Sequence, residues 1–232
     1  IDLSFFMFSI NKKLRERIVL HLGLFCSHTP TFWATELLLQ RMGVKREDVV
    51  KFYYPGNGWP GFIRIFLRGG ELIKVAEPLY WAFLGLDFFM PKGCLICDDC
   101  LNELADLSFG DAWLPKFSQD SLGTSIIIVR NLIGKKIIES AKESGKIELF
   151  EVSPQEVIQS QLNTIYFKKK SINARVKVLR LKIRRNNAFE STISDFFYAL
   201  FTYLNSQMLS KPVLLNCCLL YTSDAADDGE SV

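Results

Sequence analysis

Three cysteines stand within seven residues, at Cys94, Cys97 and Cys100 in the stretch CLICDDC, and a fourth, Cys26, lies far upstream. Thiolates are soft ligands that select zinc, copper(I) or iron–sulfur centres, and a spacing of two residues lets neighbouring thiolates reach one centre. A disulfide framework would scatter its cysteines between elements instead. The spacing therefore predicts a metal centre in a reducing compartment.

The sequence leaves the kind of metal centre open. A C-x2-C pair suits a zinc knuckle, a redox dithiol or an iron–sulfur site, and inert core thiols are a further alternative. A set of four thiolates needs Cys26, Cys94, Cys97 and either Cys100 or a ligand upstream of this chain. We expect the neighbouring acids, Asp98 and Asp99, to be solvated loop residues rather than ligands.

A few other residues could face a bound cofactor. His28 lies in the loop after Cys26 and is either a donor to a ligand or a plain loop residue, whereas His21 alternates into an apolar strand and is expected in the core. Two glycine-containing turns, Gly56–Gly61 and Leu122–Ser125, could close backbone N–H groups on an anion. Neither matches the G-x-G-x-x-G or P-loop pattern of nucleotide-binding proteins.

The stretch Lys168–Arg185 is strongly basic, and no acid occurs between Glu156 and Glu190. Val176, Leu179 and Ile183 have the spacing of one helix face, which favours a solvated amphipathic helix. The alternative interpretation is a surface for an acidic partner.

The elements that must position these residues belong to an ordinary globular protein. Of 232 residues, 49% are apolar and 23% charged, with a net charge of +3, which excludes a disordered chain and a small disulfide-stapled scaffold. The densest apolar run, Pro78 to Met90, is too short for a membrane span and contains Asp87. We therefore expect a soluble chain without a membrane span, and the crowded cysteines favour a reducing, cytoplasmic location.

Both ends of the sequence look artificial. The chain begins with Ile1 rather than Met, so we expect a fragment whose upstream residues are missing. The segment Cys218–Val232 resembles an adapter of sequencing libraries and is left out of the fold prediction. Without its four acids the net charge rises from +3 to +7.

Hydrophobic periodicity predicts a mixed α/β (α+β) fold, with a mixed sheet flanked by helices and a cysteine-rich loop that binds a cluster. Cys26 follows the first expected strand, at the end where open α/β sheets place their ligands. Strands are expected at residues 18–25 (buried), 49–54, 62–67, 72–75, 125–130 and 147–152. Helices are expected at residues 32–42, 81–89, 101–107, 134–144, 153–161 and 189–209, with a hairpin at Gly69-Gly70 and a turn at residues 108–111.

Four motifs, taken in this order, resemble one known family. They are HLGLFCSHTP at residues 21–30, YPGNGWPG at 54–61, CLICDDCLNELADLSFGDAW at 94–113 and GTSIIIVR at 123–130. Together they are similar to the coenzyme F-420 hydrogenase/dehydrogenase beta-subunit family, which also includes a chlorophyll-cycle reductase. The resemblance extends from about Val19 to Gln161.

That family binds FAD beside 4Fe–4S clusters and moves electrons between the clusters and a hydride carrier such as a deazaflavin. The resemblance implies that Cys26, Cys94 and Cys97 are cluster ligands, with Cys100 as the fourth candidate. It also implies that Arg130 offers a fork of donors to a pyrophosphate or a reduced flavin, and that Asn57 lines the hydride-acceptor side. The remaining implied flavin contacts are Gly110, Asp111, Gly123, Thr124 and Ser125.

We therefore expect a flavin and iron–sulfur domain at residues 1–161, a basic helical extension at 162–217 and the adapter-like tail at 218–232. The expected function is electron transfer between a 4Fe–4S cluster and FAD, with hydride exchange to a deazaflavin-type or other carrier. Expected partners are a redox protein or another subunit and a small hydride carrier, without nucleic acid. The alternative is a non-enzymatic, zinc-stabilised binding module whose basic helix meets an acidic partner.

Overall fold

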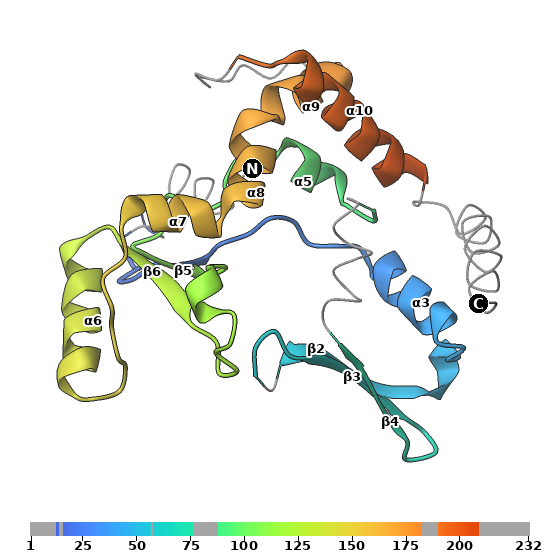
Figure 1. The fold of residues 1–232 in the computed structure, drawn as a ribbon, viewed down its shortest axis with the longest axis horizontal. Coiled ribbons are helices and arrows are strands. Elements are labelled where there is room, and N and C mark those ends of the chain that lie inside the picture. The colour runs from blue at the N-terminus through green and yellow to red at the C-terminus, as the bar shows by residue number, and fades with distance from the viewer. Residues whose placement is uncertain (1–12, 14–15, 57, 77–87, 182–189, 209–232) are drawn as a thin grey trace, which may run out of the picture. The chain divides into compact units, whose positions relative to one another are not determined.

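The computed structural model describes residues 13, 16–56, 58–76, 88–181 and 190–208. The chain forms two compact units: unit 1 comprises residues 1–28 and 96–196, and unit 2 comprises residues 29–95 and 197–232. Each unit contains a three-stranded sheet accompanied by helices (Figure 1). The predicted mixed α/β class is therefore confirmed, whereas the domain boundaries at residues 161 and 217 stay predictions.

Unit 2 is built around an antiparallel sheet in the order β2-β3-β4, formed by β2 (Val49–Gly56), β3 (Phe62–Leu67) and β4 (Leu72–Ala76). The central strand β3 buries Ile63 and Ile65 completely. Gly70 has a φ of 85° in the turn between β3 and β4, and its N–H donates to the carbonyl of Leu67 at 3.0 Å. The predicted hairpin is confirmed, because glycine adopts this left-handed conformation without steric cost.

The core of unit 2 lies between this sheet and the helix α3 (Phe32–Arg41). Leu37 and Leu38 on α3 belong to the same buried cluster as Ile63 and Ile65 of β3. Gly43, at a φ of 66°, follows the helix end, and the short helix η1 (Arg46–Asp48) connects to the sheet. The helix predicted at residues 32–42 is confirmed.

The sheet of unit 1 is mixed, with the order β1-β5-β6. The strand β5 (Leu107–Asp111) lies in the centre, parallel to β1 (Leu22–Leu24) and antiparallel to β6 (Ser125–Val129). Ser108 of β5 pairs with Gly23 on one side and Ile128 on the other, and it is completely buried. Because β1 and β5 are parallel, the segment that joins them must cross from one end of the sheet to the other.

Capping signals define the helices of unit 1. The side chain of Asn131 accepts a hydrogen bond from the N–H of Gly134 at 2.8 Å and caps α6 (Leu132–Glu143). Ser153 and Glu156 form the predicted capping box of α7 (Pro154–Ser160). The chain continues through α8 (Leu162–Ile165), the π-helical turn η3 (Tyr166–Lys170) and α9 (Ile172–Val178). The short helix η2 (Pro115–Phe117) also belongs to unit 1, whereas α5 (Lys92–Ile96) and α10 (Ile193–Met208) lie mostly in the residues of unit 2.

Two predictions around β5 are wrong. Residues 108–111 form a strand instead of a turn, because both neighbouring strands hydrogen-bond to them. Residues 101–106 form turns instead of a helix, and Asn102 has a φ of 50°, outside the helical region. Tertiary pairing overrides the local sequence preference at this place.

One predicted strand is shorter and less buried than expected, and a second one is wrong. Only residues 22–24 of the expected buried strand 18–25 pair, and Leu22 and Leu24 are 57% and 70% exposed, because β1 is an edge strand of its sheet. Residues 147–152 form no strand, since no described strand pairs with them.

The expectations for the helix before the cysteine motif and for the helices of the C-terminal side have mixed outcomes. Most of the helix expected at 81–89 lies outside the described residues. The basic helix ends at Val178, and Arg180 has a φ of 54°. The solvated interpretation is wrong for Lys168 and Arg175, which are each only 1% exposed. The aromatic helix expected at 189–209 is confirmed as α10.

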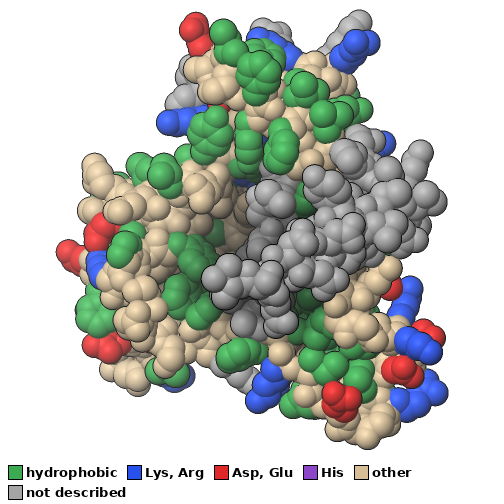
Figure 2. Space-filling model, turned by 45° about the vertical axis from the view of Figure 1, so that its right-hand side comes forward, with side chains coloured by type: hydrophobic (Ala, Val, Ile, Leu, Met, Phe, Trp, Pro, Cys, Tyr) green, Lys and Arg blue, Asp and Glu red, His purple; other side chains and the backbone are tan. Residues whose placement is uncertain are grey.

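Hydrophobic side chains also reach the surface. Figure 2 shows them over much of the visible face, and on α10 the side chains of Ile193, Phe197 and Phe201 are exposed. Among the described helices, none has the length and the apolar composition to cross a bilayer.

The close packing of Phe25, which follows β1, on β5 requires a glycine at position 110. A Cβ atom at this position would lie 2.0 Å from Cδ2 of Phe25. We expect Gly110→Ala to lower the free energy of unfolding by about 1–3 kcal/mol, because the aromatic ring and both strands must shift. Urea denaturation of the full chain measures this change.

Gly69→Ala is the matched control, since a Cβ there meets no atom within 4 Å. We expect its effect to stay within about 0.5 kcal/mol. Equal stability of the two variants would contradict the packing of Phe25 on Gly110.

Candidate functional site

Two cysteine-bearing segments of unit 1 lie side by side. Cys26 follows β1 by two residues, and its backbone N–H donates to the carbonyl of Cys100 at 2.9 Å. From Cys100 the chain returns along β1, with Asn102 beside Gly23 and Asp106 beside His21, before it enters β5. This arrangement brings Cys26 and Cys100 together at the carboxyl end of β1. Residues 97–106 are here called the cysteine loop.

The thiols of this group differ in exposure. Cys26 is exposed, Cys97 is half-buried and Cys100 is buried. The thiol of Cys97 lies 3.7 Å from the backbone carbonyl of Asp99, to which it donates. Burial raises the pKa of Cys100 to about 11, against the opposing positive charge of Lys169. Cys100 is therefore protonated at neutral pH and must release its proton to bind a metal.

Lys169 of η3 joins the basic segment to the cysteine loop. Its ammonium group forms an ion pair with the carboxylate of Glu103. Burial opposes the charge on Lys169, yet the hydrogen bond and the charge of Glu103 hold its pKa above the usual value. Part of the positive charge of this segment thus faces the cysteine loop.

Cys94 lies in α5, three positions before Cys97, and is half-buried. It is assigned to unit 2, whereas Cys26, Cys97 and Cys100 belong to unit 1. Within the described part of the chain, no three His, Cys, Asp or Glu side chains converge closely enough to hold a metal ion. The donor chemistry fits an iron–sulfur or zinc centre, but the side chains do not form an assembled metal site.

Most of the predicted flavin contacts meet at the end of the β5–β6 pair where the connecting loop joins the two strands. Asp111 pairs with Ser125 across the two strands, and Gly123 and Thr124 precede β6 directly. Asp120 organises this turn: its carboxylate accepts from the hydroxyl of Thr124 at 2.7 Å, and its carbonyl accepts from the N–H of Gly123 at 3.2 Å. The hydrogen bonds that this carboxylate accepts, above all from the hydroxyl of Thr124 and then from the N–H of Leu122, lower the pKa of Asp120.

The side chains of Asp111 and Ser125 make no hydrogen bond among the described residues, so they are available to a ligand. Gly110 lies beside them in β5, under the ring of Phe25. Asn57, the predicted contact on the hydride-acceptor side, lies outside the described residues.

Arg130 does not join this group. It follows β6 at the other end of the strand, about 15 Å away at the usual rise per residue. Its guanidinium donates to the carbonyls of Ala105 (3.0 Å) and Leu101 (3.1 Å) and to the hydroxyl of Ser108 (2.9 Å). Arg130 therefore holds the cysteine loop against β5.

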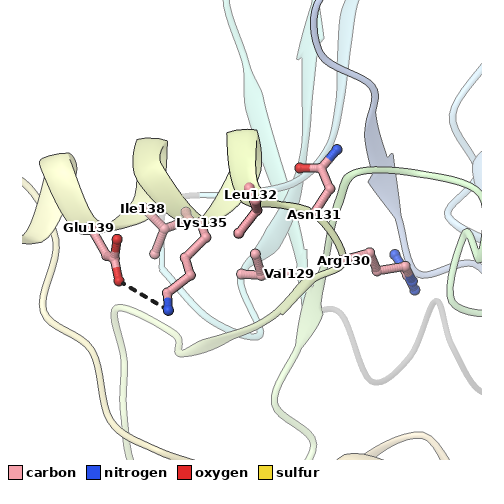
Figure 3. Close-up of a pocket in the computed structure, with 7 residues that line it drawn as sticks. All are labelled: Val129, Arg130, Asn131, Leu132, Lys135, Ile138 and Glu139. Carbon is pink, nitrogen blue, oxygen red and sulfur yellow. Dashed lines mark ion pairs between the residues drawn. The ribbon is translucent and has the colours of Figure 1, made fainter.

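Beside Arg130 lies a shallow cavity of about 550 Å³, lined by the start of α6 (Figure 3). In the close-up, Arg130 points away from Lys135 and Glu139, which form an ion pair at 3.7 Å. The backbone around Arg130 is also fixed, because Asp106 accepts from the N–H of His21 at 2.7 Å and from the side chain of Asn131.

The two histidines lie at different edges of this arrangement. His21, expected in the core, is half-buried at the start of β1, where its backbone pairs with Asp106. The ring of His28, the functional candidate, lies 6.5 Å from the ring of Phe167 on η3, measured between centroids. The segment after Cys26 therefore reaches the basic helix.

Sequence reasoning missed three residues that organise the site, namely Asp106, Asp120 and Asn131, and it missed the burial of Lys168. Asn131 was detectable, because an asparagine directly before a helical pattern is a capping signal. Asp106 and Asp120 give no such signal, since their partners are distant or depend on turn geometry. Lys168 was hidden in a run of like charges.

We expect Arg130→Ala to lower the free energy of unfolding by about 1–3 kcal/mol, because two carbonyls and one hydroxyl lose their donor. Thermal and urea unfolding of the full chain measure this effect. Lys136→Ala on α6 is a matched control, because Lys136 is exposed. Unchanged stability of Arg130→Ala would contradict the positioning role.

Comparison with known proteins identifies the family of this chain. The family model for coenzyme F420 hydrogenase/dehydrogenase, C terminus of the beta subunit, matches residues 6–155. No curated protein matches the chain. One similar solved structure is the F420-reducing NiFe hydrogenase complex from Methanosarcina barkeri in a xenon-derivatised form, with 19% identity and a TM-score of 0.48. The alignment covers 75% of this chain and 57% of the chain in that complex, so this chain spans little more than half of that relative. Because the family model covers more than half of the sequence, the chain belongs to the coenzyme F420 hydrogenase/dehydrogenase beta-subunit family.

Proposed function

We propose that this chain is part of an iron–sulfur flavoprotein oxidoreductase. It passes electrons between a 4Fe–4S cluster and FAD and exchanges hydride with a deazaflavin-type or other carrier. Family membership supports this proposal. The observation that carries it is the hydrogen bond from Cys26 to Cys100, which joins two thiol-bearing segments at the carboxyl end of β1.

The proposed cluster ligands are Cys26, Cys94, Cys97 and Cys100. Their thiolates are the ligands that iron–sulfur clusters prefer, and Cys94 and Cys97 have the spacing of a C-x2-C pair. The cluster would supply one-electron transfer and FAD would supply hydride chemistry when bound. The protein holds the thiolates, and Lys169 places a positive charge near Cys100 that favours its deprotonation.

The proposed flavin contacts are those of the β5–β6 hairpin, namely Gly110, Asp111, Gly123, Thr124 and Ser125. The hydroxyl of Ser125 is exposed and can donate to the cofactor. Thr124 donates to Asp120, so it offers a ligand only its acceptor side. Asn57 stays the proposed contact on the hydride-acceptor side, whereas Arg130 supports the cysteine loop.

Electron transfer through these cofactors requires both an electron donor and an electron acceptor. We assign one of these two roles to a redox partner protein or another subunit, and the other role to a small hydride carrier. A hydride delivers two electrons, which a flavin accepts together and an iron–sulfur cluster passes on one at a time. A flavin next to a cluster therefore suits a carrier on one side and a protein on the other.

The iron content of cysteine variants tests the proposal. We expect the full chain, purified without oxygen, to contain about four iron atoms per cluster-bearing molecule. Cys97→Ser should lose most of this iron, because a hydroxyl is a poor ligand for the cluster. Cys217→Ser, outside the proposed ligand set, is the matched control and should keep its iron.

Iron and sulfide analysis with circular dichroism separates loss of the cluster from loss of the fold. Full iron content in Cys97→Ser would overturn the ligand assignment. Zinc in place of iron in the wild-type chain would overturn the electron-transfer proposal and support a zinc-stabilised module.

A further inference from the structure

Three cations lie on one face of the sheet in unit 2. Lys51 of β2, Arg64 of β3 and Lys74 of β4 are the charged residues of these strands, which contain no acid. Arg64 lies directly opposite Lys74 of β4. On β2, Tyr53 lies opposite Arg64, and Lys51 is two positions before Tyr53. Because side chains two positions apart on a strand point to the same side, the three cations share one face, here called the basic sheet face.

The basic sheet face is the side of the sheet that points away from α3. The other side carries Ile63 and Ile65, which are completely buried in the core that α3 covers (Figure 1). On the basic sheet face, Lys51 and Lys74 are exposed and Arg64 is half-buried. These positive charges are thus accessible to a partner from outside the chain.

An aromatic ring holds two of the cations in place. The Nζ atom of Lys51 lies 4.6 Å from the centroid of the Tyr53 ring, and the Cζ atom of Arg64 lies 4.8 Å from the same centroid. The ring of Phe66 packs edge-on against Tyr53, with 5.8 Å between the centroids. The two positive charges therefore converge on one ring, which is itself fixed by its neighbour.

The three cations have no counter-charge within the described part of the chain. Their side chains form neither a hydrogen bond nor an ion pair with a described residue, and Nε of Arg64 is a buried donor without a partner there. Asp48 and Glu71, the acids closest to these strands along the chain, stand just before β2 and β4 and pair with none of the three. The positive charge of this face is therefore uncompensated among the described residues.

The pair of Arg64 and Lys74 opposes folding. Like charges directly opposite each other on neighbouring strands destabilise a sheet, because their Cβ atoms are only about 5 Å apart. A negatively charged partner would relieve this repulsion. The cross-strand pair thus gives a reason, independent of exposure, to expect that the face binds an anionic partner.

The aromatic and apolar residues of this face favour an acidic protein over a nucleic acid. Bases stack on the free faces of aromatic rings, whereas the Tyr53 ring already contacts two cations and Phe66. Two exposed apolar side chains, Phe62 at one end and Leu72 at the other, flank the cations on the same face. A centre of arginine and tyrosine with apolar contacts around it is typical of protein interfaces.

We propose that the basic sheet face of unit 2 is the docking surface for a protein partner whose contact surface is acidic. The guanidinium of Arg64 offers a planar fork that fits a carboxylate, and Lys51 and Lys74 add point charges from the two neighbouring strands. The identity of this partner as the redox protein or subunit rests on the proposed function, whereas the surface itself rests on the charges of the sheet.

Fluorescence anisotropy of the full chain with a labelled decaglutamate peptide tests the docking surface. We expect the peptide to bind the wild-type chain, with an affinity that falls as the salt concentration rises. The double variant of Arg64→Gln and Lys74→Gln should lose about tenfold or more in affinity.

The matched control is the double variant of Lys45→Gln and Lys136→Gln. Both lysines are exposed and lie outside the sheet, and their replacement removes the same amount of charge. The affinity of this control for the peptide should stay within about threefold of the wild-type value.

The stability of a single variant gives a second readout. Because Arg64 and Lys74 repel each other, Lys74→Gln alone should keep or raise the urea midpoint of unfolding while it weakens peptide binding by about threefold. This variant keeps the test decisive if the double variant does not fold, which circular dichroism checks. A lowered midpoint for Lys74→Gln would contradict the uncompensated repulsion on which the docking surface depends.

The outcomes separate this surface from the proposed function. Absence of binding by the wild-type chain, or wild-type affinity in the folded double variant of Arg64 and Lys74, would overturn the docking surface. Tighter binding of decathymidylate than of the peptide, lost in the same variant, would assign the face to nucleic acid and overturn it as well. A chain without iron and flavin that binds the peptide through Arg64 and Lys74 would refute the proposed function and keep the surface. Iron and flavin in a chain whose double variant binds the peptide normally would refute only the surface.

Discussion

The arrangement of unit 1 depends on a network of hydrogen bonds around Asp106, Arg130 and Asn131. Asp106 bonds to the start of β1 through both its backbone and its carboxylate, and the same carboxylate accepts from Asn131. Asn131 in turn caps α6, and Arg130 binds two carbonyls of the cysteine loop. One network thereby fixes the edge strand, the loop, the end of β6 and the start of a helix.

This constraint explains how a loop without regular structure can present cysteines. The carbonyls of Leu101 and Ala105 would lack partners in a turn-rich segment, and the guanidinium of Arg130 satisfies them. Earlier in the loop, the carbonyl of Cys100 accepts from the N–H of Cys26. The loop is therefore tied at Cys100, Leu101 and Ala105, and Cys97 lies three residues before the first of these ties.

The charges of unit 1 follow the same arrangement. Lys169 reaches the cysteine loop through Glu103, while Lys168 and Arg175 turn inward. The basic segment 168–178, whose sequence is typical of a solvated helix, is thus partly buried inside unit 1. In the proposed function, the charge of Lys169 lies near the thiols that would bind the cluster.

Elements with strong local signals were predictable from the sequence. The capping box at Ser153 and Glu156, the Gly69-Gly70 hairpin and the helix before Gly43 all depend on residues within a few positions of each other. The strand β5 was not predictable, because Ser108-Phe109-Gly110-Asp111 favours a turn until β1 and β6 pair with it.

In the candidate site, too, some features could be predicted from the sequence and others could not. The cysteine motif and its proximity to the end of β1 follow from spacing and strand order, and the structure agrees for Cys26 and Cys100. The sequence could not reveal that Arg130 binds the cysteine loop, because its partners lie more than 20 residues away. Nor could it reveal the burial of Lys168, because burial depends on the packing of distant segments.

The visible absorption spectrum of the full chain, purified without oxygen and combined with iron and flavin analysis, tests the central claim most directly. The account predicts the bands of oxidised flavin over a broad iron–sulfur absorption, because both cofactors absorb visible light. A colourless chain that contains zinc and no flavin would contradict it.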